Sequence, residues 1–171
     1  YHMQLLLLYG QNDGIPIVET AITPAEIYQP RNSVEECLAF INKELDEVCA
    51  IEGKEIFPVL WDEGRRSRMC KAYAWALKMD VNLQFGKYDI AKDAAKKIID
   101  SGEFELYFTT AEDDDPGKNY RDLCNYTGKQ NKERIMFTPD GLKEFWFRSL
   151  GVPLGGQGTA AVLRSLVDTY E

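Results

Sequence analysis

Small and apolar residues recur at helical spacing on both sides of a glycine turn in the middle of the chain. The turn is Phe85-Gly86-Lys87-Tyr88, and glycine can adopt the positive φ that a sharp reversal often needs. Small side chains allow two helix axes to approach closely. The pattern therefore predicts a hairpin of two helices over residues 66–101, of the tetratricopeptide type. Its small and apolar positions are Ala72, Ala74, Trp75, Ala76, Ala91, Ala94, Ala95 and Ile98.

A second helical pattern precedes the hairpin. Apolar residues recur every three or four positions, which predicts a helix over residues 33–50 with one buried stripe. Ser33 and Glu36 stand three positions apart at its start. This spacing predicts a capping box, in which the serine oxygen accepts an amide of the first turn and the glutamate reaches back. The stripe consists of Val34, Cys37, Leu38, Ile41, Leu45 and Val48.

The other segments carry weaker patterns. Residues 103–159 are predicted to form a loop-rich region, called the irregular region below. Within it, residues 139–159 are irregular and rich in glycine and aromatic residues, and long segments of this kind are often functional loops. The Pro-interrupted segment Ile15-Pro16-Ile17-Val18 is expected to pack on the core in extended form. We also expect a buried helix end at 1–9, a connector at 10–30, a loop at 51–64, a helical turn at 120–123, a short strand at 133–138 and a final helix at 160–170.

These elements together predict a mostly α fold. A helical hairpin cannot bury its own apolar face, so it needs neighbouring helices. We expect tetratricopeptide-like hairpins with long irregular loops and little β structure, forming a single domain or fragment over residues 1–171. Within the hairpin, Trp75, Tyr88 and Ala91 are expected to be core residues. Both ends of the chain interrupt structured-looking sequence, so we interpret it as a piece of a longer protein.

Composition narrows the possible functions. The net charge of -8 and the pI near 4.8 argue against nucleic-acid binding, which needs a basic face. The single histidine is His2, which excludes a histidine-based metal centre or catalytic triad within this chain. The cysteines are widely spaced, without a CxxC pair, and are interpreted as small apolar residues. We expect no cofactor and no resident metal.

Other motifs do not indicate catalysis. The glycine-rich segment 154–159 lacks the ending of a phosphate-binding loop, and Asp113-Asp114-Asp115 lacks the spacing of a calcium loop. The arginines at positions 65, 66 and 68 are interpreted as surface charge at a helix start, with Arg65 making a structural contact. No nucleophile motif is present, and no spacing singles out a pair of catalytic carboxylates. We therefore expect a binding protein, not an enzyme.

Aromatic residues in the predicted loops are the best candidates for ligand contacts. Trp146 and Trp61 lie in such loops, with Tyr126 as a further candidate. A sugar ring can stack its C–H groups on an indole face while its hydroxyls bind polar side chains. Arg148 and Gln157, with Asp140, are the predicted polar contacts around Trp146. The alternative interpretation is that this aromatic cluster packs under the fold.

Short motifs follow one another in a fixed order along most of the chain. They are Tyr9-Gly10 with Ile15-Pro16-Ile17-Val18, Gln29 to Glu36, Ile41 to Val48, Gly64-Arg65 with the alanine-rich helix, Gly86-Lys87-Tyr88, Ile99 to Leu106, Asn131 to Phe137, and Leu166 to Tyr170. The ordered set resembles the SusD/RagB family of outer-membrane nutrient-binding lipoproteins. The chain departs from the family pattern at residues 12–14, which widen a turn, and at 160–165, where the usual prolines are replaced.

The resemblance implies a function at the cell surface. It implies non-catalytic binding of an extracellular glycan or related nutrient, delivered to a SusC-like TonB-dependent channel of the outer membrane. Membrane attachment would use only a lipid anchor outside this chain, on a surface-exposed lipoprotein. Two other classes stay open: an intracellular tetratricopeptide-type scaffold that binds protein peptides, and an all-α hydrolase.

Overall fold

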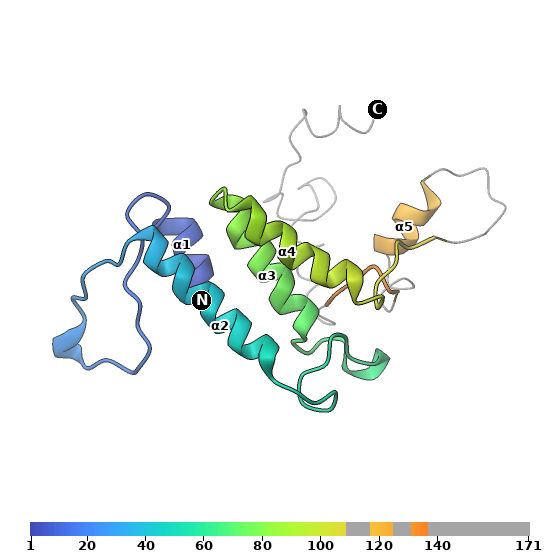
Figure 1. Cartoon of the computed structure of the whole chain (residues 1–171), viewed down its shortest axis with the longest axis horizontal. Helices are drawn as coiled ribbons and strands as arrows, with labels where there is room; N and C mark the ends of the chain where they lie inside the picture. Colours follow the sequence, from blue (N-terminus) through green and yellow to red (C-terminus); the bar gives the residue numbers. More distant parts are fainter. Residues whose placement is uncertain (109–116, 125–130, 137–171) are drawn as a thin grey trace, which may run out of the picture. The chain divides into compact units, whose positions relative to one another are not determined.

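The computed structural model describes residues 1–108, 117–124 and 131–136, which belong to one compact unit, Tyr1–Met136. In this part of the chain the regular structure is entirely helical (Figure 1). The predicted mostly α fold is therefore confirmed, whereas residues 133–136 are not the strand that the sequence predicted. The helices are α1 (His2–Tyr9), α2 (Val34–Ala50), α3 (Lys71–Gln84), α4 (Tyr88–Asp100) and α5 (Lys118–Cys124), with short 3-10 turns at Pro24–Glu26 and Glu63–Arg65.

The helices α3 and α4 form the predicted hairpin and run side by side (Figure 1). Gly86 has a φ of 70° at the reversal, in the left-handed region that favours glycine. The reversal is closed by the backbone N–H of Lys87, which donates to the carbonyl of Asn82 at 2.8 Å. The tight turn thus places the two helices in immediate antiparallel contact.

Four of the six buried residues of the hairpin helices are alanines. Ala72 and Ala74 of α3 are 0% and 5% exposed, and Ala91 and Ala94 of α4 are 4% and 2% exposed. Such small side chains permit close approach of the helix axes. The placement of Ala91 in the core is confirmed, but Tyr88 is 67% exposed and its predicted core position is wrong. Tyr88 is the first residue of α4, where its helical position turns it outward.

The main core lies where α1 and α2 meet α3. Cys37, Leu38 and Ile41 of α2 are buried there as the stripe predicted, and Val34 and Leu45 pack at its edge. Val48, the last member of the predicted stripe, is 38% exposed. The buried residues of α2 all lie in its first half, so its second half is left to line a groove. The other buried members of this cluster are Leu6, Ile15 and Val81.

The start of α2 is fixed by the predicted capping box. The backbone N–H of Glu36 donates to Ser33 Oγ at 3.3 Å, and Glu36 Oε2 accepts from the backbone N–H of Ser33 at 2.7 Å. These backbone and hydroxyl hydrogen bonds from Ser33 lower the pKa of Glu36. The capping box therefore satisfies the backbone N–H groups of Ser33 and Glu36 at the start of the helix.

The segment 15–18 of the connector packs on the core, as predicted, and belongs to no helix. Ile15 is 5% exposed, and Ile17 donates its backbone N–H to Asn32 Oδ1 at 3.0 Å. Arg31 donates to the carbonyls of Tyr9 and Gly14 at 3.2 and 3.0 Å. These bonds close the long connector onto itself between α1 and α2.

A pair of asparagines joins α2 to α3, and the sequence patterns gave no sign of it. Asn42 and Asn82 exchange side-chain amide hydrogen bonds of 3.1 and 2.7 Å. Asn82 is completely buried, and its amide also donates to the carbonyl of Lys78 at 2.7 Å. A buried amide is tolerated only when its hydrogen bonds are satisfied, so this pair fixes the position of α2 along α3.

Two glycines allow the strain of a turn to be separated from a steric clash. Gly14 and Gly86 have nearly equal φ, 71° and 70°. A Cβ at Gly14 would lie 1.9 Å from the carbonyl oxygen of Asn32, whereas a Cβ at Gly86 would have no atom within 4 Å. We predict that Gly86→Ala lowers the free energy of unfolding by about 1–2 kcal/mol from backbone strain, and that Gly14→Ala lowers it by clearly more.

Urea denaturation of both variants measures this difference. Gly64→Ala is the matched control, because Gly64 has no positive φ and its Cβ would meet only Asp62 Oδ1 at 3.9 Å. Equal losses for Gly14→Ala and Gly86→Ala would contradict the close approach of the connector to the start of α2.

Candidate functional site

Of the predicted ligand-contact residues, the structure describes one. Trp61 lies in the loop before α3, as the sequence predicted. The roles assigned to the others stay predictions because they lie outside the described residues, as do the acidic segment 113–115, the glycine-rich segment 154–159 and the expected helix at 160–170. The undescribed candidates are Tyr126, Asp140, Trp146, Arg148 and Gln157.

Trp61 is packed into its own loop. Its side chain is 6% exposed, and its indole N–H donates to the carbonyl of Met69 at 2.7 Å. The guanidinium of Arg65 lies 4.7 Å from the ring centroid and that of Arg68 lies 5.8 Å from it. The ring also packs with Cys70 and Ala72 at the start of α3. In this arrangement Trp61 holds the loop against α3, and a stacked ligand would have to displace an arginine.

Arg65 makes the structural contact that the sequence analysis expected. It donates to Asp62 from Nε and Nη2, the shortest distance being 2.6 Å, and it lies 3.7 Å from Glu55. The hydrogen bonds with Arg65 lower the pKa of Asp62, and those with Asp62 raise the pKa of Arg65. This exposed network fixes the guanidinium over the face of Trp61.

Arg66 corrects one prediction, because it is not surface charge. Arg66 is only 8% exposed, and its Nη1 donates to the backbone carbonyl of Asn131 at 2.8 Å. The Nε atom is buried without a hydrogen-bond partner. The sequence pattern could not separate this arginine from its neighbours, because its partner lies 65 residues further along the chain. Arg66 therefore links the start of the hairpin to the segment 131–136.

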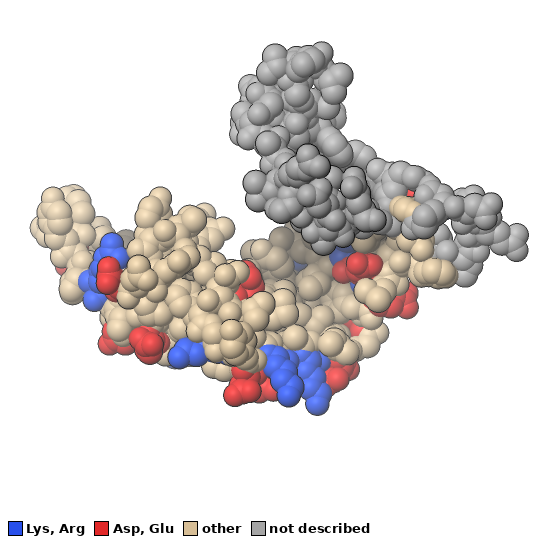
Figure 2. Space-filling model, turned by 90° about the horizontal axis from the view of Figure 1, so that it is seen from above, with Lys and Arg blue, Asp and Glu red and all other residues tan. Residues whose placement is uncertain are grey.

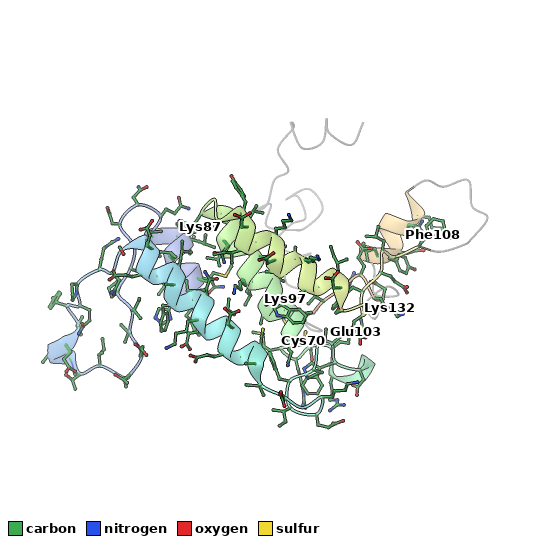
Figure 3. All side chains as sticks on the ribbon, viewed as in Figure 1. Cys70, Lys87, Lys97, Glu103, Phe108 and Lys132 are labelled. Atoms are coloured by element: carbon green, nitrogen blue, oxygen red, sulfur yellow. The ribbon has the colours of Figure 1, made fainter. Side chains whose placement is uncertain are left out.

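The segments 103–108 and 131–136 are joined to each other by a hydrogen bond and an ion pair. Tyr107 donates its backbone N–H to Glu133 Oε2 at 2.7 Å, and Lys132 lies 3.5 Å from Glu105. Arg134 donates to the carbonyl of Leu123 at the end of α5. A hollow of about 460 Å³ lies beside these contacts, where Figure 3 labels Phe108 and Lys132. It is lined by residues 105–108 with Asn131 and Lys132.

The described side chains offer little for catalysis or metal binding. No group of three or more His, Cys, Asp or Glu that could hold a metal occurs among them. Cys37 and Cys70 are free thiols that are each 1% exposed, and burial raises the pKa of Cys70 and of the half-buried Cys49. A raised pKa keeps a thiol protonated and weakly nucleophilic. In Figure 2, basic and acidic side chains are interspersed on the visible face and form no single basic patch.

Comparison with known proteins identifies the fold. No family model and no curated protein matches the chain. A crystal structure of a SusD-like protein from Bacteroides fragilis NCTC 9343 is similar with a TM-score of 0.72 and 23% sequence identity, covering 99% of this chain and 34% of that one. The chain thus spans about a third of that structure. Among the described residues of the chain, no helix is long and apolar enough to cross a membrane. The chain has a SusD-like helical fold.

The packing of Trp61 predicts a structural role that can be measured. Trp61→Phe keeps a ring but removes the donor to the Met69 carbonyl, so we expect a loss of about 1–2 kcal/mol in the free energy of unfolding. Trp61→Ala also leaves a cavity, and we expect a loss of about 3–5 kcal/mol. Chemical denaturation measures both, with Tyr28→Ala as an aromatic control because Tyr28 is 96% exposed. A Trp61→Ala protein as stable as the control would show that Trp61 is not a packing residue.

Proposed function

We propose that the chain is part of a non-catalytic protein that captures an extracellular glycan or related nutrient at the cell surface. The observation that carries this proposal is the SusD-like fold, which extends over 99% of the chain with a TM-score of 0.72. The captured ligand would pass to a TonB-dependent outer-membrane transporter of the SusC type. The protein would be a surface-exposed lipoprotein whose lipid anchor lies outside this chain.

The described helices suit a supporting role in such a protein. The hairpin and α2 share a core and the buried amide pair Asn42–Asn82, so they form a rigid scaffold. Arg66 attaches the segment 131–136 to the loop before α3, and Glu133 joins that segment to Tyr107 at the start of the irregular region. Binding residues on loops are effective when a rigid scaffold positions those loops.

The ligand contacts belong, in this proposal, to the irregular region. Trp146 would stack on a sugar ring, with Arg148 and Gln157 binding its hydroxyls. Tyr126 is a second stacking candidate. Trp61 would serve mainly to hold its loop, since only 6% of it is exposed. The absence of a nucleophile motif from the sequence supports binding without turnover.

The alternative function, an intracellular scaffold for peptides, makes a different prediction about the full-length gene product. A surface protein needs an export signal that ends in a lipidated cysteine, whereas a scaffold needs none. The likeness to a SusD-like structure favours capture over a generic helical repeat.

Glycan binding by Trp146 can be tested with defined oligosaccharides. Maltohexaose, cellohexaose, laminarihexaose and xylohexaose are titrated into the chain and into Trp146→Ala by calorimetry. We expect at least one to bind, and Trp146→Ala to weaken that binding about tenfold, which corresponds to about 1.4 kcal/mol from a lost stacking contact. Tyr28→Ala, which removes an exposed aromatic of the connector, should leave the affinity unchanged.

Two results would count against different parts of this proposal. Unchanged affinity in Trp146→Ala would remove that residue from the site while leaving capture intact. Failure of all four oligosaccharides to bind would count against a neutral glycan ligand altogether.

A further inference from the structure

A groove runs along the helical part of the molecule, lined by residues of the helices. The helix α3 packs against both α2 and α4 (Figure 1). The groove is lined by residues of all three helices. Its volume is about 980 Å³, at the upper end of the range of small-molecule sites. We call it the helix groove and define it by Asn42, Asp46, Trp75, Lys78, Asp93 and Lys97.

Trp75 is the one aromatic residue among the described residues that line the helix groove, beside the smaller apolar side chains of Ile90 and Ala94. It is half-buried, since it packs against the cluster around Cys70 and Ala72 and also lines the groove. The sequence analysis expected packing alone. An indole that is partly buried and also lines a groove is restrained by its packing and can still contact a ligand through its exposed part.

The polar side chains beside Trp75 are already fixed. Lys78 Nζ binds both carboxylate oxygens of Asp46 at 2.7 Å, and its side chain is 13% exposed. Asn42 is held by the buried amide of Asn82. Because these groups are ordered before any ligand arrives, binding would cost little side-chain entropy.

Among the described residues, three carboxylates and three ammonium groups line the helix groove, so its charges balance. A net charge of either sign would attract an ionic ligand, so the balance argues against phosphorylated compounds and strongly charged peptides. So many charged groups would also leave an apolar helix with poorly matched contacts. A neutral ligand that both donates and accepts hydrogen bonds, and that has an apolar face for the indole, fits all of these features. The carboxylates are Asp46, Asp93 and Asp100, and the ammonium groups are Lys78, Lys96 and Lys97.

We propose that the helix groove binds a stretch of neutral oligosaccharide, with a sugar ring on Trp75 and its hydroxyls between α2 and α4. The proposal rests on the proposed function for the class of ligand, and it adds a second contact surface to that function. Lys97 of α4, labelled in Figure 3, and Asp93 bind the sugar hydroxyls from one wall.

The chain carries three tryptophans, and their indole N–H signals report the two proposed surfaces separately. The same four oligosaccharides are titrated into the ¹⁵N-labelled 171-residue chain, and heteronuclear NMR spectra are recorded. The Trp75 signal is assigned from its loss in Trp75→Phe. We expect at least one oligosaccharide to shift the Trp75 signal in a saturable way, while the Trp61 signal stays in place because its N–H is bound to Met69.

Variants of α4 test the wall of the groove without disturbing its floor. Lys97→Ala should weaken the titration at Trp75 about fivefold, the effect of one lost hydrogen bond. Lys92→Ala is the matched control, since Lys92 is exposed on the same helix and does not line the groove. Equal affinities in the two variants would overturn the assignment of Lys97.

The outcomes separate this inference from the proposed function. A shift at Trp146 alone would overturn the helix groove as a sugar site and leave glycan capture standing. A shift at Trp75 alone would support the groove and remove Trp146. A Trp75 signal that moves with protein concentration in the absence of sugar would assign the groove to a second copy of the chain and overturn the inference. Polyglutamate and polylysine are titrated in the same way, and a response of Trp75 to one of these charged polymers but to no oligosaccharide would also overturn it.

Discussion

Close contact between α3 and α4 is the constraint on which the rest of the described structure depends. It requires a tight reversal, which Gly86 provides at a φ of 70°, and small buried side chains, such as that of Ala91 on α4. The two helices have 14 and 13 residues, a length at which an isolated helix is only marginally stable in water. The hairpin is therefore the unit on which α2 and the loop before α3 are assembled.

The two neighbours of the hairpin are attached by different means. Apolar packing and the buried pair Asn42–Asn82 join α2 to α3, and the amide pair sets their position because a shifted helix would leave Asn82 buried without partners. The loop before α3 is held by Trp61 and by Arg66, which reaches Asn131. The packing of α2 against α3 forms part of the helix groove, and the hydrogen bond of Arg66 fixes the segment 131–136.

Sequence patterns predicted the features that depend on neighbours in the chain. The capping box of Ser33 and Glu36, the apolar stripe of α2 and the turn at Gly86 are all set within a few residues. Features set by distant partners were missed: three nearby arginines look alike, and only the fold turns Arg66 toward Asn131. Trp75 was expected to pack, but its second role in lining a groove depends on where α2 and α4 lie. Of the predicted ligand contacts, Trp61 is the one that can be placed, and its burial follows from the Met69 carbonyl and two arginines.

The most direct test of this account is the stability of a chain whose hairpin contact is enlarged at one position. Ala91 is 4% exposed on α4 and does not line the helix groove, whereas Lys92 lies on the exposed side of the same helix. Ala91→Leu should lower the free energy of unfolding by about 1–3 kcal/mol, because the added atoms force the helices apart. Lys92→Leu should change it by less than about 0.5 kcal/mol. Equal stability of the two variants in urea denaturation would contradict the close packing of α3 and α4.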